Sequence, residues 1–534
     1  MDWRGRERYT IFSSAWNQAD FDDWVAQWRA DAARPRRLHV IALAEGGLPG
    51  FERILQADGA ITLDLLHAPP EAALARLQAR IDMVVWDGAS VPRALARLLN
   101  RDATLSAPAL DGAARTALAD SGWISSGEHC WRYATRKPIA PPAPAPQRSA
   151  IVVGAGLAGA AACQRLCARG WQVTLLERHP AAAMEASGNL AGISMPLLSK
   201  DDNITSRLSR AAFMFARAYW NSLGGVGAAI EGDVCGVLLA ARDAGNARLQ
   251  RAIAQVHTFP AGFAQWCEPG ERFGALAPHG AWLFPSGSWI RPGSAIGAML
   301  TACGPALHAQ FGVGDVSLHR EGDGWAARGA DGTNIGRAAT VIVASGGGVI
   351  AQTASLPFDR VRGQVTHLQA DAAPELGLVL CREAYLTPAA GGVRSAGATY
   401  DDDADPALRQ SSQDQNLANM RSMLADDGLA LDAPLAGRVG FRSVAPDRLP
   451  MVGAVPDSTF TVGAERLREL PRQPGVYALL AYASRGLIWA PLAAELLAAQ
   501  LEGEPLPLET DLAEALDPGR FLLRARRSKA PFFV

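Results

Sequence analysis

The stretch IVVGAGLAGAAACQRL, residues Ile151–Leu166, constrains the fold more than any other part of the sequence. Its apolar start predicts a buried strand, its alanine-rich end predicts a helix, and glycines separate the two. Gly154, Gly156 and Gly159 have the spacing G-x-G-x-x-G. A strand that turns directly into a helix at such glycines is typical of the first unit of a doubly wound α/β sheet.

The three glycines and one acidic residue fit the binding of a dinucleotide. Gly154 permits the tight turn, Gly156 lets the backbone approach a pyrophosphate, and Gly159 lets the helix pack on the strand. The helix N terminus then presents free N–H groups and the positive end of its dipole to the phosphates. The next strand, WQVTLLE, ends at Glu177, about 20 residues further on, where a carboxylate accepts hydrogen bonds from a ribose. The alternative is an ordinary β–α turn without a ligand.

A single complete fingerprint predicts FAD rather than a nicotinamide cofactor, because two-nucleotide reductases usually carry a second one. The other glycine-rich turn, VIVASGGGVI (Val341–Ile350), lacks that spacing. Near its C-terminal end the sequence returns to a strand, YALLAYASRGL, and a helix, APLAAELLAAQLEG. A chain that leaves and re-enters its nucleotide-binding domain predicts a Rossmann-like FAD-binding domain interleaved with an α+β substrate domain. Oxygen is the simplest electron acceptor to expect.

A proline-rich stretch divides the sequence into two parts. KPIAPPAPAPQRS, residues 137–149, disfavours helix and sheet and predicts a semi-rigid extended linker. Residues 1–136 contain three apolar runs that predict strands, RLHVIALA, ITLDLLHA and IDMVVWDG, together with amphipathic runs that predict helices. This alternation predicts a small α/β domain with a largely parallel sheet. Residues 150–534 are expected to form the FAD-dependent oxidoreductase domain.

Composition excludes several classes of protein. The net charge of −2 argues against a general polycation that binds nucleic acid, although a local basic face remains open. No uninterrupted apolar run reaches about 18 residues, so no membrane span is expected, and the charged start MDWRGRERYT lacks a signal core. The seven cysteines show no C-x-x-C spacing, which predicts reduced thiols, no metal site and a cytoplasmic location. The oligomeric state is left open.

Four long stretches of residues 150–528 resemble one protein family. They are EASGNLAGISMPLLSKDDNITSRLSRAAFMFARAYW, VRGQVTHL, GFRSVAPDRLPMVGAVPD and SRGLIWAPLAAELLAAQLEGEPLPL. They resemble the FAD domain of the MnmC family, the bifunctional tRNA 5-methylaminomethyl-2-thiouridine biosynthesis proteins, in the D-amino-acid oxidase/glycine oxidase superfamily. The resemblance implies oxidative removal of the carboxymethyl group from 5-carboxymethylaminomethyl-2-thiouridine at the tRNA wobble position. The products would be 5-aminomethyl-2-thiouridine and glyoxylate.

The resemblance also implies which arginines serve the reaction. Arg442, in the sequence GFR, stands where similar oxidases place an arginine that binds the substrate carboxylate. A bidentate arginine suits a carboxylate, and a structural salt bridge is the alternative. Arg485, in SRGL, lies at a late strand–helix junction that approaches the flavin in the superfamily, or has a structural role. Arg394, in AAGGVRSAGATY, is a further candidate.

Further cofactor-binding residues follow from the same resemblance. Ser187, Gly188 and Asn189 are expected in a second segment that contacts FAD, and Gly346 and Gly486 in turns next to it. The complete expected FAD site also includes the residues of the fingerprint: Gly154, Gly156, Gly159 and Glu177.

Residues 1–136 resemble the methyltransferase domain of the same family, but the parts that bind its cofactor are missing. The family has a turn of the type E-T-G-F-G-x-G-x-N-F after its first strand, whereas this chain has SSAWNQADF (Ser13–Phe21), without glycine. Side chains there block close approach of the cofactor and disfavour positive φ. The loop after Asp87 is shortened as well. We therefore predict a truncated methyltransferase-like domain that neither binds S-adenosylmethionine well nor methylates; a bifunctional enzyme that retains methylation is the alternative.

Three interpretations of the whole chain remain open. The favoured one is an FAD-dependent oxidoreductase that modifies tRNA. A small-molecule amine oxidase of the glycine or sarcosine type is the enzymatic alternative. A flavin- and RNA-binding protein without turnover is the third. Two basic stretches, ARPRRLH (residues 33–39) and FLLRARRSK (residues 521–529), are candidate contacts for tRNA phosphates or ordinary solvated faces.

Overall fold

A computed structural model describes residues 3, 5–56, 59–134, 147–425, 435–459 and 464–528, with side chains as far as residue 525. The chain divides into two compact units. The first comprises residues 1–148 and 495–514, and the second comprises residues 149–494 and 515–534. The linker predicted at residues 137–149 lies mostly outside the described residues. Residues 495–514, which the sequence analysis places in the oxidoreductase domain, group with the first unit.

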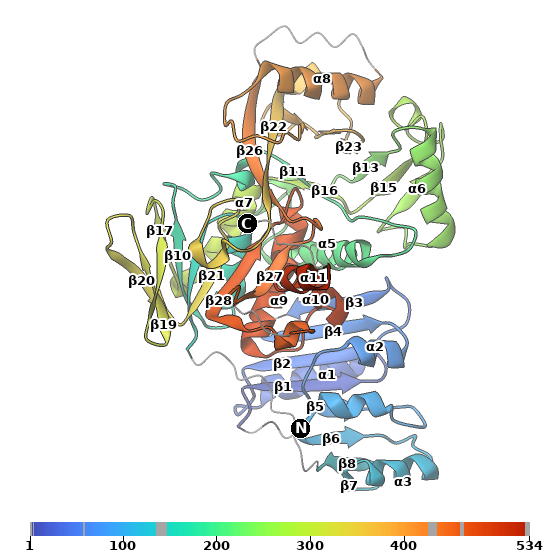
Figure 1. Cartoon of the computed structure of the whole chain (residues 1–534). Helices are drawn as coiled ribbons and strands as arrows, with labels where there is room; N and C mark the ends of the chain where they lie inside the picture. The colour runs from blue at the N-terminus through green and yellow to red at the C-terminus, as the bar shows by residue number, and fades with distance from the viewer. Residues whose placement is uncertain are drawn as a thin grey trace. The chain divides into compact units, whose positions relative to one another are not determined.

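An eight-stranded sheet forms the centre of the first unit, in the order β3-β4-β2-β1-β5-β6-β8-β7 (Figure 1). The five strands from β4 to β6 are parallel, and the strands at both edges are antiparallel. The predicted α/β fold with a largely parallel sheet is therefore confirmed. The strands are β1 (Arg8–Ser13), β2 (Arg37–Leu43), β3 (Gly50–Gln56), β4 (Ile61–His67), β5 (Ile81–Val85), β6 (Leu99–Ser106), β7 (Trp123–Ser125) and β8 (Cys130–Tyr133).

Apolar side chains cover both faces of this sheet. Ile11 and Phe12 are neighbours in β1 and belong to two different core clusters, because successive side chains of a strand point to opposite faces. Phe21 and Trp28 of the first helix pack on the face of Ile11. The other helices pack on the face of Phe12. The helices are α1 (Gln18–Ala30), α2 (Pro70–Arg76), a 3₁₀ helix (Arg93–Leu98) and α3 (Gly112–Asp120).

A buried ionic network ties residues 495–514 into the first unit. Arg53 on β3 donates two hydrogen bonds to Asp64 on β4, each 2.7 Å long, and one of 2.9 Å to Glu495. It also donates to the carbonyl oxygen of Pro505 over 2.7 Å. His39 bonds to the same Asp64 carboxylate over 2.8 Å. All four ionisable side chains are almost completely buried, so each depends on the others for its polar contacts.

The second unit contains a six-stranded sheet in the order β17-β10-β9-β21-β28-β27. Its strands are parallel except for β27 at one edge. The chain enters this sheet at its centre with β9, leaves it after β10, and returns for β17 and β21 and again after residue 450 for β27 and β28, as the sequence predicts for a Rossmann-like domain. The strands are β9 (Ser149–Val153), β10 (Gln172–Glu177), β17 (Leu307–Phe311), β21 (Thr340–Val343), β27 (Met451–Pro456) and β28 (Arg472–Leu480).

Some helices of the second unit connect strands of this sheet, and others pack elsewhere in the unit. α4 follows β9, and α9 follows β28 and ends in the first unit. The helices that lie at least partly in the second unit are α4 (Leu157–Cys167), α5 (Ile204–Ser222), α6 (Ala244–Val256), α7 (Pro292–Ala302), α8 (Gln410–Leu424), α9 (Gly486–Glu502) and α11 (Arg520–Ser528), whereas most of α10 (Thr510–Leu516) groups with the first unit. None of the helices in the described part of the chain is long and apolar enough to cross a membrane.

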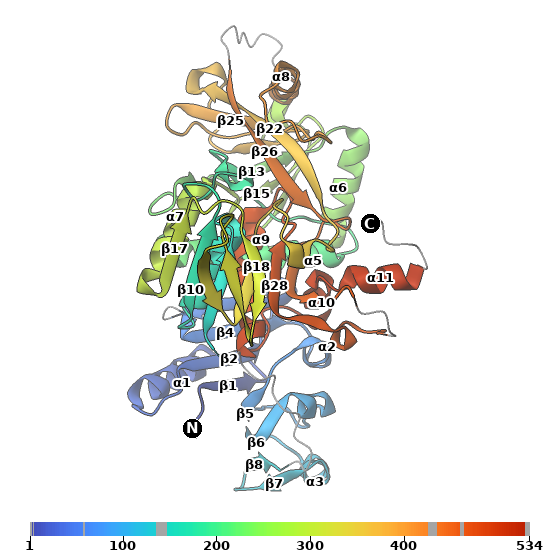
Figure 2. The same cartoon turned by 60° about the vertical axis from the view of Figure 1, so that its left-hand side comes forward.

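A second, mixed sheet of eight strands forms the substrate part of this unit, in the order β14-β15-β13-β23-β24-β25-β22-β26. Its two longest strands, β22 and β26, run side by side, with α8 close to one end of them (Figures 1 and 2). The strands are β13 (Val237–Ala240), β14 (Gln265–Cys267), β15 (Ala281–Phe284), β22 (Asp359–Gln369), β23 (Val379–Cys381), β24 (Tyr385–Leu386), β25 (Val393–Gly397) and β26 (Ala436–Val444).

Two three-stranded sheets complete the second unit. One has the order β11-β16-β12 and the other β18-β19-β20. Their strands are β11 (Gly192–Ser194), β12 (Gly232–Asp233), β16 (Ser288–Ile290), β18 (Ser317–Glu321), β19 (Gly324–Arg328) and β20 (Asn334–Ala338). The predicted combination of an FAD-type α/β domain with an α+β domain is thus confirmed.

Candidate FAD and substrate site

The glycine turn between β9 and α4 has the geometry that its sequence predicts. Gly154 has a φ of 107°, and a Cβ there would lie 2.6 Å from the carbonyl oxygen of Ala344. A Cβ on Gly159 would overlap the carbonyl oxygen of Gly154, so this glycine lets α4 pack against the turn. Gly156 is the N-cap residue of α4 and has no side chain that could cap the helix. The N terminus of α4 is therefore left for a ligand anion.

Glu177 closes one side of this turn. It ends β10, is 7% exposed, and accepts N–H groups from Ala155 over 2.6 Å and from His179 over 3.0 Å. Each carboxylate oxygen thus takes one backbone donor. A carboxylate has about four acceptor positions, so acceptors remain for ribose hydroxyls.

Ser187, Gly188 and Asn189 lie beside the same turn, as the resemblance implies. The hydroxyl of Ser187 accepts the N–H of Leu157 over 3.2 Å, at the N terminus of α4. Arg438 of β26 fixes this segment by donating to the carbonyl oxygens of Met184, over 2.8 Å, and Glu185. A Cβ on Gly188 would overlap the Arg438 guanidinium. Ser187 and Asn189 line the cavity described below, whereas Gly188 makes room for Arg438.

Arg438 is not among the site residues predicted from the sequence. Its contacts reach residues about 250 positions away in the chain, so no local pattern announces them. The only signal is that Arg438 and Arg442 are four residues apart in one strand, which places both side chains on the same face.

The cavity of the second unit has a volume of about 1220 Å³. This exceeds the range of about 300–1,000 Å³ typical of small-molecule sites, so it has room for a dinucleotide and a substrate group. It is lined by the glycine turn, Glu177, the loop of Gly346 and the N terminus of α9 at Gly486. Gly346 has a φ of 58°, in the left-handed region that favours glycine.

Two buried hydroxyls in the cavity wall indicate that a ligand is expected there. Tyr482 and Ser443 line the cavity, and neither hydroxyl has a hydrogen-bond partner among the described residues. Buried polar groups are normally satisfied, so such groups call for a ligand or water. The residues on both sides of Tyr482, Ala481 and Ala483, have positive φ values of 62° and 49°. Such strain in residues other than glycine clusters at functional sites. Together with the open glycine turn, these features fit FAD.

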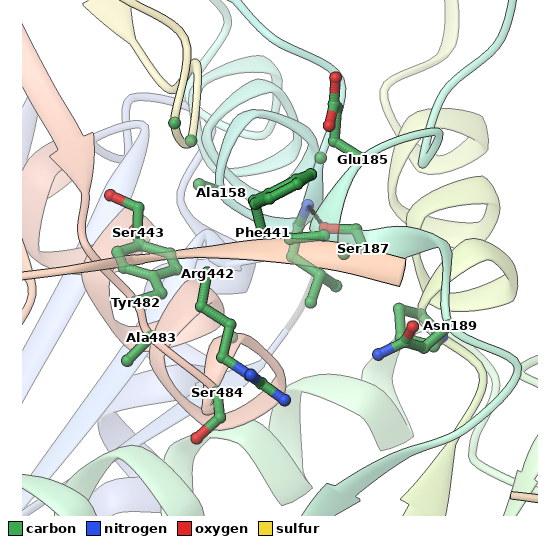
Figure 3. Close-up of a pocket in the computed structure, with 18 of the residues that line it drawn as sticks. Ala158, Glu185, Ser187, Asn189, Phe441, Arg442, Ser443, Tyr482, Ala483 and Ser484 are labelled. Atoms are coloured by element: carbon green, nitrogen blue, oxygen red, sulfur yellow. Dashed lines mark hydrogen bonds between the residues drawn. The ribbon is translucent and has the colours of Figure 1, made fainter. Parts of the chain in front are cut away.

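Arg442 projects from β26 on the side opposite to Phe441 and Ser443 (Figure 3). It donates to the carbonyl oxygen of Thr399 over 3.1 Å, and its guanidinium lies 4.2 Å from the ring centre of Tyr400. The guanidinium of Arg442 lies against Gly363, and a Cβ atom at that position would overlap the guanidinium. No carboxylate of the described residues forms an ion pair with it. The salt-bridge alternative from the sequence analysis thus has no support in the described part of the chain.

Arg485 lies at the N terminus of α9 and lines the same cavity. It donates to the carbonyl oxygen of Met195 over 3.3 Å. Burial lowers its pKa, and no carboxylate of the described residues pairs with it. A desolvated cation beside a helix N terminus is a place of high positive potential, which favours an anion.

Arg394 is not brought together with Arg442 and Arg485. It is 2% exposed, does not line the cavity, and donates to the carbonyl oxygens of Ala370 and Pro374 and to the carboxylate of Glu375. These contacts use the guanidinium to hold the segment after β22, which favours a structural role.

The cavity offers no reactive thiol or metal site. Cys381 lines it, but burial raises the pKa of this thiol to about 12, so the thiolate is not formed near neutral pH. Within the described ranges, no group of three or more His, Cys, Asp or Glu side chains is arranged to hold a metal ion. The lining of the cavity offers arginines, hydroxyls and a glycine-lined turn.

The two basic stretches are only partly described. Arg34 donates to the carbonyl oxygen of Arg29 and lies 4.8 Å from the ring centre of Trp28, and Arg36 is exposed. Arg524 pairs with Asp447 over 2.6 Å. The side chains of residues 526–529 lie outside the described part.

At the end of the first unit's sheet that would correspond to a methyltransferase cofactor crevice, Ser14 forms hydrogen bonds with residues at and just after the end of β5. In parallel sheets such crevices lie at the carboxyl ends of strands where the strand order reverses, here β1 and β5. The N–H of Ser14 donates to the carbonyl oxygen of Val85 over 2.9 Å, and the hydroxyl of Ser14 accepts the N–H of Asp87 over 2.8 Å. Asn17 caps α1 by accepting the N–H of Ala19 over 2.8 Å.

Comparisons with known proteins agree with this geometry. Residues 149–500 match the family described as DAO, FAD dependent oxidoreductase. The chain is 38% identical to the "tRNA 5-methylaminomethyl-2-thiouridine biosynthesis bifunctional protein MnmC" of Azoarcus sp. (strain BH72), over 98% of this chain and 92% of the relative. It is 37% identical to the protein of the same description from Burkholderia thailandensis, with the same coverage.

The alignment with the Azoarcus relative spans 584 positions, more than the 534 residues of this chain, so the relative contains segments that this chain lacks. Among solved structures, glycine oxidase from Geobacillus kaustophilus shares the fold, with a TM-score of 0.56 and 20% identity over 70% of this chain and 98% of that one. Iminodiacetate oxidase from Chelativorans sp. BNC1 has a TM-score of 0.53 and 23% identity over 67% and 96%. The chain belongs to the DAO family of FAD-dependent oxidoreductases and, within it, to the family of MnmC proteins.

Proposed function

We propose that this protein removes the carboxymethyl group from 5-carboxymethylaminomethyl-(2-thio)uridine at the tRNA wobble position, with FAD as the oxidant. The observation that carries the proposal is Arg442, a cavity-lining cation without a described carboxylate partner, in a chain whose relatives are named for tRNA 5-methylaminomethyl-2-thiouridine biosynthesis. The substrate supplies the missing carboxylate. The same substrate implies a cytoplasmic location.

The reaction balances as an oxidation followed by hydrolysis. The CH₂ between the carboxylate and the secondary amine loses a hydride, and the amine nitrogen loses its proton, to give a C=N bond. Bound FAD would supply the oxidant for this hydride, with oxygen as the final acceptor of the two electrons. Water then adds to the C=N carbon, and the C–N bond breaks to release glyoxylate and the aminomethyl nucleoside.

Residues of the second unit have distinct roles in this proposal. Arg442 binds the substrate carboxylate with two N–H groups, which also fixes the orientation of the adjacent CH₂. The positive charges of Arg442 and Arg485 disfavour the ammonium form of the substrate, and only the neutral amine can lose a hydride. The residues that would hold FAD are Gly154, Gly156, Glu177, Ser187, Asn189, Gly346, Arg485 and Gly486.

Anaerobic reduction of the flavin tests the reaction. Holoenzyme would be mixed with tRNA carrying the modified base, unmodified tRNA, glycine or sarcosine, and the loss of the oxidised flavin absorbance would be followed. We expect reduction by the modified tRNA and none by unmodified tRNA. Reduction by the free amino acids alone would support the small-molecule oxidase instead. Reduction by none of them would support a binding protein without turnover.

We further propose that the first unit does not bind S-adenosylmethionine well and does not methylate. The support is the turn after β1, which has side chains where the family has glycines, and the hydrogen bonds of Ser14 to Val85 and Asp87. Residues Ser13–Phe21, all of them described, include no positive φ. Equilibrium dialysis with labelled S-adenosylmethionine tests this proposal. Saturable binding at micromolar concentration, or methyl transfer to aminomethylated tRNA, would favour the bifunctional alternative.

A further inference from the structure

Tyr400 is an exposed aromatic residue at the substrate end of the cavity. It lines the cavity, yet 65% of its surface is accessible. One face of its ring packs on the Arg442 guanidinium at 4.2 Å, a cation–π contact. With one face taken and most of the residue accessible, the rest of the ring is open to a planar group. A single exposed tyrosine is ordinary elsewhere on a surface, but this one lines a cavity beside a cation without a described carboxylate partner, where its ring can receive a ligand.

The backbone around Tyr400 is held firmly from both sides. The N–H of Asp401 donates to the carbonyl oxygen of Arg362, and the N–H of Arg362 donates to that of Asp401, both over 3.0 Å. The N–H of Thr399 donates to the carbonyl oxygen of Gln364 over 3.2 Å, and the hydroxyl of Thr399 accepts the N–H of Gln364 over 3.1 Å. The Arg362 guanidinium is fully buried and pairs with the Asp401 carboxylate over 2.7 Å. The ring of Tyr400 is therefore presented from a fixed backbone, so little conformational entropy is lost when it binds a ligand.

The position of Tyr400 beside Arg442 matches the chemistry of the substrate. In 5-carboxymethylaminomethyluridine a short arm separates the carboxylate from the pyrimidine ring. A surface that receives the ring must therefore lie close to the group that binds the carboxylate. Tyr400 touches that group directly.

We propose that Tyr400 is the stacking surface for the nucleobase that carries the carboxymethylaminomethyl arm. The proposal rests on the proposed function and deepens it, because it names the residue that distinguishes a nucleotide from a small amino acid. Stacking suits this task, since a base offers its π face whatever its exocyclic groups. Arg442 then selects for a glycine-like carboxylate, and Tyr400 selects for a planar ring attached to it.

Three variants and three substrates test the proposal. Tyr400→Leu removes the aromatic face, Tyr400→Phe keeps it, and Leu249→Ala replaces a large apolar residue that is 68% exposed and does not line the cavity. The substrates are the modified tRNA, the free modified nucleoside, and N-ethylglycine, which has the carboxylate and amine without a base. The readout is KM from flavin reduction or, for a compound that reduces the flavin too slowly, its inhibition constant against the modified tRNA.

For Tyr400→Leu we expect KM or the inhibition constant to rise about tenfold or more for tRNA and nucleoside, and less than about twofold for N-ethylglycine. Tyr400→Phe is expected to restore the native values, and Leu249→Ala to leave them unchanged. An equal rise for all three compounds would overturn the proposal, because Tyr400 would then act only by positioning Arg442. A rise for tRNA alone would also overturn it in favour of a contact elsewhere on the RNA. If modified tRNA failed to reduce the flavin of the native holoenzyme, that result would instead refute the proposed function.

Discussion

The buried ionic network of the first unit and the cavity wall of the second unit treat their polar groups in opposite ways. In the first unit the buried Arg53 has two carboxylates and a carbonyl oxygen as partners, and Ser14 and Asn17 accept N–H groups after β1. In the cavity wall of the second unit Arg442 and Arg485 have no carboxylate partner among the described residues, and the N-cap residue of α4 is a glycine, which has no side chain to cap the helix. A satisfied group contributes to stability, whereas an unsatisfied group in a cavity is available to a ligand. The comparison therefore predicts stability defects from one unit and binding defects from the other.

The largest effect is expected from Arg53→Met. It leaves the carboxylates of Asp64 and Glu495 buried with fewer partners, so the free energy of unfolding of the first unit should fall by about 3–5 kcal/mol. Hydrogen exchange of peptides that cover β3 and β4 measures this change. The matched control is Arg36→Met, at an exposed arginine of the same unit, which should change protection little. Equal protection in Arg53→Met and the native protein would mean that the network does not stabilise the unit.

Gly156→Asn gives α4 of the second unit the same N-cap residue type that Asn17 provides for α1 of the first unit. Gly156 has a φ of −84°, so the backbone accepts asparagine, but the side chain would occupy the helix N terminus and the approach of the pyrophosphate. We expect FAD affinity to fall by at least about 100-fold, or about 2.7 kcal/mol. Flavin retained after dialysis measures it. Gly297→Ala, in α7 with no atom within 4 Å of the new Cβ, should retain full flavin content.

Arg442→Leu separates function from stability in the second unit. A charge-assisted hydrogen bond contributes about 1.5–3 kcal/mol, so kcat/KM with modified tRNA should fall roughly 10- to 150-fold. Because the guanidinium has no described carboxylate partner, the melting temperature should stay the same or rise. A fall in melting temperature as large as that of Arg53→Met would contradict the contrast between the units.

The pH dependence of the first unit should follow His39. Burial lowers the pKa of His39, and the nearby Asp64 only partly offsets this. Below about pH 6.5, the ordinary histidine value, the unfolded chain binds a proton that the folded unit does not. Stability is therefore fully present above that pH and decreases as the pH falls towards the folded pKa. Hydrogen exchange of β2 at pH 7.5 and 5.5 measures the decrease, and His39→Gln, which still donates to Asp64, should reduce it.

Local sequence patterns predicted the parts of the site that depend on neighbouring residues. The glycine spacing gave the turn before α4, the end of β10 gave Glu177, and the resemblance placed Arg442 in the cavity wall. The pairing of Arg438 with Met184 and the grouping of Glu495 with Arg53 depend on contacts hundreds of residues apart. No periodicity or spacing encodes such contacts, because they arise only when distant strands and helices pack.

The same limit explains the different outcomes for two arginines. Arg394 and Arg442 both occupy strands of the substrate sheet and are equivalent in a sequence pattern. They differ in what the fold places around them, since Arg394 meets Glu375 and two carbonyl oxygens and Arg442 meets one carbonyl oxygen and an open cavity. Whether an arginine is structural or free to bind a ligand is thus a property of its tertiary surroundings.

The smallest expected effect comes from the turn of the first unit. Asn17 accepts N–H groups at the start of α1, so Asn17→Ala should destabilise this helix by about 1 kcal/mol, whereas Asn17→Gly should cost only a few tenths. Hydrogen exchange of the first turn of α1 would then be about fivefold faster in the alanine variant. The result sharpens the contrast with Gly156, because the equivalent position in one unit would serve the helix and in the other the cofactor. Asn17→Gly could instead produce saturable binding of S-adenosylmethionine. That result would mean that only the Asn17 side chain obstructs the turn, and that the rest of the first unit can still bind this cofactor.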